Sequence, residues 1–162
     1  MENIRHLIEV LKSQVNLYSE LSDLMASEKQ AIVSWSIDKT VEITKKKDAL
    51  LRKERIQSEA RNALLAKIAS AQNMPSLKIS DVINIAQAEA IEEADELAGL
   101  CEQIVELVTH IHAENISLKM LYATNNRLIN DFFTQIGLSD ASAGGYGPSG
   151  KQKRASTIHR VG

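Results

Sequence analysis

Two histidines on a predicted helix are the first residues in this sequence that could do chemistry. His110 and His112 stand two positions apart. Side chains at that spacing point about 200° apart around a helix, so the two imidazoles cannot bind one metal ion together. A Glu-x-x-His pair of the kind that holds metal ions inside helical bundles does not occur in the sequence either. We interpret both as ordinary histidines, one near a helix seam and one in solvent, and expect no metal site.

Carboxylates and a single cysteine are the other candidates for chemistry. Paired carboxylates can act as acid and base only where a pocket desolvates one of them, whereas a run of them on a helix usually forms a solvated face. Cys101 is followed by Glu102 and has no cation near it in the sequence, so nothing lowers the pKa of its thiol, and we expect it to pack at a helix seam. With no glycine-rich phosphate loop and no nucleophile elbow, the sequence predicts neither an enzyme nor a cofactor. The acidic run is Glu89, Glu92, Glu93, Asp95, Glu96, Glu102 and Glu106.

The composition predicts helices as the elements that position these residues. Hydrophobic residues make up 44% of the chain and aromatic residues only 4%. Before residue 137 the only glycine is Gly99 and the only proline is Pro75, whereas a β-rich fold would need many turn residues. The fold class is therefore predicted to be all-α, a long antiparallel helical hairpin or bundle with coiled-coil character and a flexible C-terminal tail.

The hydrophobic pattern predicts helices over about 3–34, 37–72, 80–87 and 90–136. The first has a heptad-like stripe with two polar positions, Gln14 and Glu28, which either set the register of packing or face water. The second is polar nearly all round in its middle, which favours a helix that projects from the body as half of a long hairpin, while the alternative that it packs back stays open. Ser36 and Ser80 are the predicted N-caps of the second and third helices, and Gly137 is the predicted C′ residue of the last.

A change of composition divides the chain into a helical bundle over 1–137 and a disordered basic tail over 138–162. The net charge is −2, with +3 from residue 139 onward and −5 before it, so the body is too acidic for nucleic acid to be the main partner. One cysteine fits a reducing compartment. With neither a signal peptide nor an apolar run of about 20 residues, we expect a cytoplasmic protein with no stable membrane insertion.

The last long helix carries more apolar residues than one seam needs. Tyr122, Ile129, Phe133 and Ile136 lie beside the main stripe, which includes Leu118, Leu121, Leu128 and Phe132. Two interpretations remain open. Either the first and second helices cover both flanks of this stripe, or the stripe is a groove that receives an amphipathic helix of another protein.

The layout and the last third of the chain resemble the flagellar export chaperone family FlgN. The first helix has Glu28 near its end, the second is rich in lysine, and a proline break follows. Asn115 and Asn126 match the asparagine-bearing stretch of the family. The segment Tyr146-Gly147-Pro148-Ser149-Gly150 matches its tail motif, before a basic segment over 151–160. His112 stands where the family often has another asparagine, and Ile116 stands where it has a glycine.

The resemblance implies a concrete function and two kinds of site. It implies a chaperone that binds the C-terminal helical regions of hook–filament junction (hook-associated) proteins, prevents premature assembly and delivers them to the flagellar type III export gate. Docking at the gate would use Tyr146, Gly147 and Gly150. The alternative is a structural or signalling coiled-coil protein that acts by self-association. Cargo binding would use Leu118, Leu121, Tyr122, Asn126, Ile129, Phe132, Phe133 and Ile136.

Overall fold

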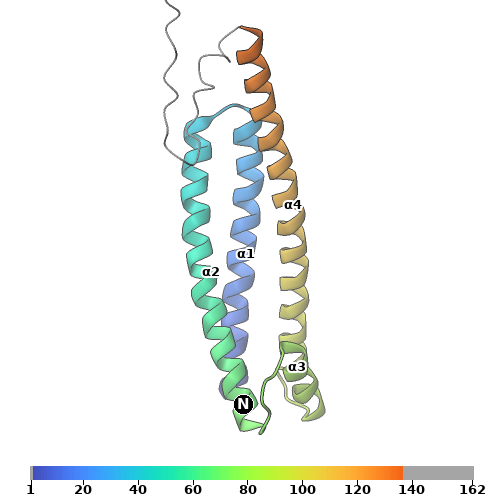
Figure 1. Cartoon of the computed structure of the whole chain (residues 1–162). Helices are drawn as coiled ribbons and strands as arrows, with labels where there is room; N and C mark the ends of the chain where they lie inside the picture. Colours follow the sequence, from blue (N-terminus) through green and yellow to red (C-terminus); the bar gives the residue numbers. More distant parts are fainter. Residues whose placement is uncertain (1, 137–162) are drawn as a thin grey trace, which may run out of the picture. The chain divides into compact units, whose positions relative to one another are not determined.

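The structure, a computed structural model, describes residues 2–136. This part of the chain consists of four helices and no strands: α1 over Glu2–Val33, α2 over Ile37–Ala71, α3 over Ile79–Ala88 and α4 over Ala94–Gln135 (Figure 1). The predicted all-α fold class is confirmed. The predicted tail over 138–162 and the C′ residue Gly137 lie outside the described residues, so the division into bundle and tail stays a prediction.

The chain divides into two compact units, Met1–Tyr122 and Ala123–Gly162. The first unit holds α1, α2, α3 and the part of α4 that ends at Tyr122. The described part of the second unit is the rest of α4 and the residue after it. The two units are described separately below.

In the first unit, α1 and α2 form an antiparallel hairpin, and α4 runs in the same direction as α1 (Figure 1). Side-chain contacts between the helices show both directions. Gln14 contacts Ser58 and Glu28 contacts Lys47, so residue numbers on α2 fall as those on α1 rise, which is the antiparallel order. The ion pairs Lys12–Glu96 and Lys29–Glu114 show that residue numbers on α1 and α4 rise together, which is the parallel order. The expectation that α2 projects from the body is therefore wrong, because α2 lies along α1 with Ile43, Leu50, Ile68 and Ala69 buried.

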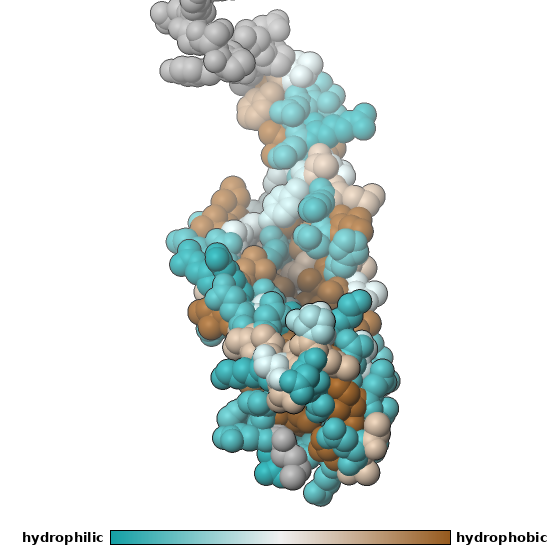
Figure 2. Space-filling model, turned by 60° about the horizontal axis from the view of Figure 1, so that its bottom comes forward, coloured by the Kyte–Doolittle hydropathy of each residue, from teal (hydrophilic) through white to brown (hydrophobic). Residues whose placement is uncertain are grey.

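Two clusters of buried apolar side chains form the core of this unit. Figure 2 shows one face of the molecule, on which apolar patches are broken up by hydrophilic side chains. The first cluster joins all four helices through Ile4, Leu7, Ile8, Leu11, Ile68, Val82, Leu97 and Leu100. The second joins α1, α2 and α4 through Leu17, Leu21, Met25, Ile32, Leu50 and Leu118.

The first three helices end in the same way, each with one residue in the left-handed conformation. At the end of α1, Trp35 has a φ of 54°, and the N–H of Ser36 donates to the carbonyl of Ala31, five residues back. This hydrogen bond defines a Schellman motif, in which glycine is the usual left-handed residue. Asn73 after α2 and Ala90 after α3 occupy the same position, with φ values of 54° and 52°.

The structure corrects two predicted helix starts, and the predicted N-cap Ser80 is wrong because Lys78 holds that position and Ser80 lies in the first turn of α3. Because Ala90 terminates α3, α4 begins at Ala94 rather than near 90. The α3 helix begins at Ile79, and its first turn is capped by Asp81, whose Oδ2 accepts a hydrogen bond of 2.8 Å from the backbone N–H of Lys78. Ser36 does stand at the N-cap of α2, although its side chain makes no capping hydrogen bond.

Candidate functional site

The residues that could do chemistry are not brought together into a catalytic site in residues 2–136. His110 and His112 are both exposed, so neither lies near the predicted seam. Within the described part of the chain no group of three or more His, Cys, Asp or Glu residues is placed to hold a metal ion. Cys101 packs against the first core cluster, and burial raises the pKa of its thiol. The positive charge of Arg61 on α2 lowers the same pKa and so opposes this shift. A cation therefore does lie near the Cys101 thiol, although none stands near it in the sequence.

Two carboxylates of the acidic run connect the start of α4 to α1. Glu93 accepts a hydrogen bond of 2.6 Å from Arg5, and Glu96 lies 2.9 Å from the ammonium of Lys12. The hydrogen bond from Arg5 holds the pKa of Glu93 below its ordinary value. Since neither pair lies in a closed pocket, these carboxylates have no environment that would make them an acid–base pair.

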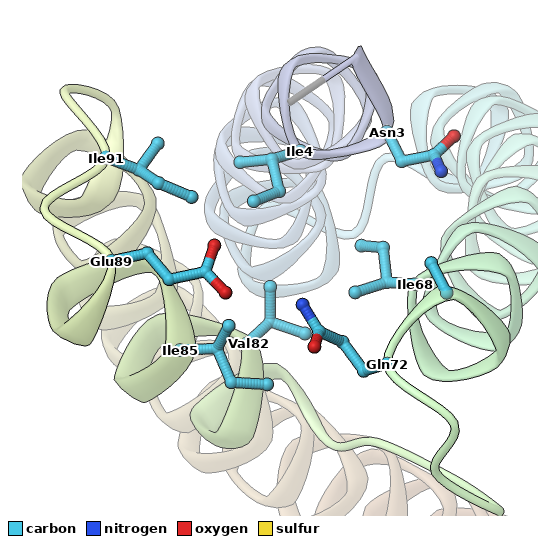
Figure 3. Close-up of a pocket in the computed structure, with 9 residues that line it drawn as sticks. Asn3, Ile4, Ile68, Gln72, Val82, Ile85, Glu89 and Ile91 are labelled. Carbon is cyan, nitrogen blue, oxygen red and sulfur yellow. The ribbon is translucent and has the colours of Figure 1, made fainter.

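A shallow cavity of about 260 Å³ lies where α1 begins, α2 ends and α3 packs against both (Figure 3). Its inner surface is aliphatic, and the amide of Gln72 and the carboxylate of Glu89 point into it. Such a lining can receive an aliphatic group but offers no nucleophile. The aliphatic side chains are Ile4, Ile68, Val82, Ile85 and Ile91.

Gln14, the first polar residue of the α1 stripe, is fully buried and bonded to α2. Its amide nitrogen donates to the hydroxyl of Ser58 at 3.4 Å, and its carbonyl oxygen accepts from the guanidinium of Arg61 at 3.2 Å. One turn further along, the hydroxyl of Tyr18 donates to Glu54 at 3.0 Å, and Ser58 donates to the same carboxylate. Because every partner lies on α2, these bonds set the register of α1 against α2.

Glu28, the second polar residue of the stripe, is 3% exposed and joins all three long helices of the first unit. Its carboxylate accepts a hydrogen bond from the ammonium of Lys47 on α2 and another, of 2.8 Å, from the hydroxyl of Tyr122 on α4. Burial, followed by the hydrogen bond to Glu28, raises the pKa of Tyr122 to about 12. The sequence left open whether Gln14 and Glu28 set the register of helix packing or face water. The structure supports the first interpretation, because both side chains are buried and bonded to other helices.

The described residues of the second unit carry an exposed apolar surface, which we call the terminal surface. Every side chain from 126 to 136 is exposed. The rings of Phe132 and Phe133 contact each other edge to face, with centroids 6.0 Å apart. Apart from an ion pair of 4.0 Å between Arg127 and Asp131, the surface has no charge. Its apolar members are Leu128, Ile129, Phe132, Phe133 and Ile136, between 38% and 58% exposed.

The predicted cargo-binding residues therefore fall into two groups. Asn126, Ile129, Phe132, Phe133 and Ile136 are exposed and available to a partner. Leu118 is 2% exposed in the second core cluster, and Leu121 packs against that cluster. Tyr122 is 37% exposed, but its hydroxyl is bonded to Glu28. In this conformation a partner cannot reach Leu118. The predicted docking residues Tyr146, Gly147 and Gly150 lie outside the described residues.

A comparison with family models identifies the group to which this all-helical chain belongs. The family model described as FlgN protein matches residues 1–154. The chain belongs to the FlgN family. Comparisons with curated proteins and with solved structures gave no match.

Membership of FlgN confirms the resemblance inferred from the sequence and supplies a general function. FlgN is a family of chaperones of flagellar type III export, and it is not a family of enzymes. No helix in the described part of the chain is long and apolar enough to cross a membrane. In this FlgN chain the sequence singled out Gln14 and Glu28 as polar residues inside an apolar stripe. It did not identify the residues on α2 and α4 to which they bond.

Proposed function

We propose that this FlgN chain is a cytoplasmic export chaperone that acts by binding and not by catalysis. Its cargo is the C-terminal helical region of hook-associated proteins, which it keeps from assembling before it delivers them to the flagellar type III export gate. The observation that carries the proposal is the terminal surface, where four large apolar side chains are exposed on the last turns of α4 and a fifth, Ile136, is exposed directly after it.

The terminal surface has the chemistry of a site for an amphipathic helix. Its apolar residues follow helical spacing, with Ile129, Phe133 and Ile136 on one line and Leu128 and Phe132 beside it. Large exposed apolar patches on soluble proteins typically mark sites for partners, and helix-in-groove recognition uses anchors at this spacing. A subunit that polymerises through its terminal helices has an apolar face of the complementary kind, and covering that face prevents assembly.

Cargo binding is tested with a peptide from the C-terminal helical region of a hook-associated protein and the full-length chain. Phe132→Ala combined with Phe133→Ala should weaken binding at least tenfold by calorimetry, because aromatic side chains at an interface typically contribute above about 1 kcal/mol each. The matched control is Ile56→Ala, which truncates a side chain that is 66% exposed on α2. Unchanged affinity in the double variant, with helicity intact, would remove the terminal surface from cargo binding.

Delivery to the gate is a separate part of the proposal and is assigned to Tyr146. Tyr146→Ala should leave the affinity for the cargo peptide unchanged while reducing export of the cargo in cells. Loss of peptide affinity in this variant would instead assign the tyrosine to cargo binding. A chain that binds no cargo but forms stable oligomers would favour the alternative, a structural coiled-coil protein.

A further inference from the structure

The cavity between the ends of α1, α2 and α3 combines aliphatic walls with two polar side chains that point into it (Figure 3). The amide of Gln72 comes from the end of α2, and the carboxylate of Glu89 comes from the end of α3. Most of the remaining surface is aliphatic, and it includes Val82, which is 1% exposed. A ligand that fits this cavity therefore has an alkyl part and a polar end.

The charges at the cavity favour a cation as that polar end. Glu89 forms no salt bridge within residues 2–136, whereas Arg5, which follows the wall residue Ile4, is already paired with Glu93. Gln72 and Glu89 are also the C-caps of α2 and α3. The C-terminal end of a helix carries partial negative charge, and two of the three helix ends at the cavity are C-terminal. A cation here meets an unpaired carboxylate and two helix C-termini.

The lining distinguishes among the cations that proteins commonly bind. A metal ion needs several oxygen, nitrogen or sulfur ligands, and the cavity offers one carboxylate and aliphatic walls. A guanidinium stacks on aromatic rings, and the lining contains none. A lysine side chain has a long methylene stem that lies on apolar surface and a compact ammonium at its end. A free polyamine has at least one more ammonium, for which the lining has no second carboxylate.

We propose that this cavity is a binding site for a lysine side chain of another protein. The methylene stem lies against Ile4, Val82 and Ile85, and the ammonium donates to the carboxylate of Glu89 and the amide oxygen of Gln72. Because Glu89 is exposed, the ion pair adds little affinity, and we expect a dissociation constant in the millimolar range for an isolated lysine. The cavity shares no residue with the terminal surface, so the proposal stands independently of cargo binding.

Nuclear magnetic resonance of the full-length chain, labelled at its isoleucine methyl groups, tests the site. The probe is the peptide acetyl-Ala-Lys-Ala-amide. It should shift the methyl signals of Ile85 and Ile91, which line the cavity, and leave the signal of Ile56, which is 66% exposed elsewhere on α2. A peptide with norleucine in place of lysine keeps the alkyl chain and lacks the ammonium. It should bind about fivefold more weakly.

Two variants separate the polar and the apolar part of the contact. Glu89→Gln should weaken binding of the lysine peptide about fivefold and leave that of the norleucine peptide unchanged, whereas Glu92→Gln, at an exposed position nearby, should change neither. Ala71→Leu narrows the cavity from α2 and should weaken binding of both peptides. Its matched control is Ala49→Leu, at an exposed position of the same helix. Circular dichroism confirms that all four variants are folded.

Several results would overturn the proposal. The cavity is not a lysine site if the signals of Ile85 and Ile91 do not move at about 50 mM peptide, well above the expected dissociation constant. Equal affinity for the two peptides would show that Glu89 does not recognise the ammonium. Shifts that survive both Glu89→Gln and Ala71→Leu would place the peptide on another surface. Spermidine that binds about tenfold tighter than the lysine peptide, and loses this affinity in Glu89→Gln, would assign the cavity to a free polyamine.

Discussion

The two lengths of α4 differ in how their apolar side chains are used. Up to Tyr122 the helix packs against α1, with Leu97 and Leu118 in the core. From residue 126 to 136 every side chain is exposed, although five of these eleven residues are large and apolar. An apolar stripe at helical spacing therefore predicts a helix but does not decide whether its side chains are covered within the chain or left for a partner.

Tyr122 is the last residue of the first length, and it is held by a polar contact. Its hydroxyl reaches Glu28, which Lys47 also bonds, so α1 and α2 both contribute to fixing the helix at this position. From Ala123 onward α4 belongs to the second unit. The comparison predicts that mutations of the buried residues before Tyr122 affect stability and that mutations of the terminal surface affect binding.

The largest expected effect comes from one substitution made in each length of α4. Leu97→Ala removes a fully buried side chain and should lower the free energy of unfolding by about 3 kcal/mol, because it leaves a cavity in the first core cluster. Leu128→Ala truncates a leucine that is 54% exposed and should change the free energy of unfolding by less than about 0.5 kcal/mol. Urea denaturation followed by circular dichroism measures both.

The reverse order of these two effects would contradict the comparison. If Leu128→Ala were as destabilising as Leu97→Ala, the terminal surface would be part of a core in solution. The surface would then be unavailable to cargo.

A smaller loss is expected from Glu28→Ala. It leaves the ammonium of Lys47 and the hydroxyl of Tyr122 without their partner, which should cost about 2 kcal/mol because Lys47 keeps some access to solvent. Glu28→Gln keeps an acceptor for Tyr122 and should cost less. The control is Glu20→Ala, at an exposed position of the same helix, and thermal unfolding compares the three variants. Equal stability of Glu28→Ala and the control would show that the buried carboxylate does not hold α4.

The sequence predicted the helices well because their apolar spacing reports directly on burial. In α1, Leu7, Leu11 and Leu21 are buried as the stripe requires. The same reasoning failed for α2, whose polar middle suggested a projecting helix. There the polar side chains, among them Lys47 and Arg61, are the partners of Gln14 and Glu28, so their polarity serves packing.

The helix ends and the candidate site were harder to predict. Glycine usually marks a Schellman end, but Trp35, Asn73 and Ala90 fill that position here, so no sequence signal placed the start of α4 at Ala94. For the site, the spacing identified Phe132 and Leu118 as members of one stripe. It could not reveal that Leu118 is buried and Phe132 exposed, because that difference depends on which neighbours pack along α4.

The smallest expected effect is a change in how stability depends on alkaline pH, and it tests the position where the two lengths of α4 meet. The pKa of Tyr122 is about 12 in the folded chain and about 10 when unfolded, so the phenol stays protonated longer in the folded state. Its contribution to stability is complete below pH 10 and is lost as the pH rises from 10 towards 12, because only the unfolded state gains from ionisation. Tyr122→Phe should therefore show a shallower loss of stability over this interval. Tyr18, whose pKa is also about 12, causes stability to fall with rising pH in that variant too.

The difference in tyrosinate absorbance between wild type and Tyr122→Phe gives the pKa of Tyr122 directly. A value near 10 would mean that Tyr122 is not bonded to Glu28, and the fixed length of α4 would then end before it.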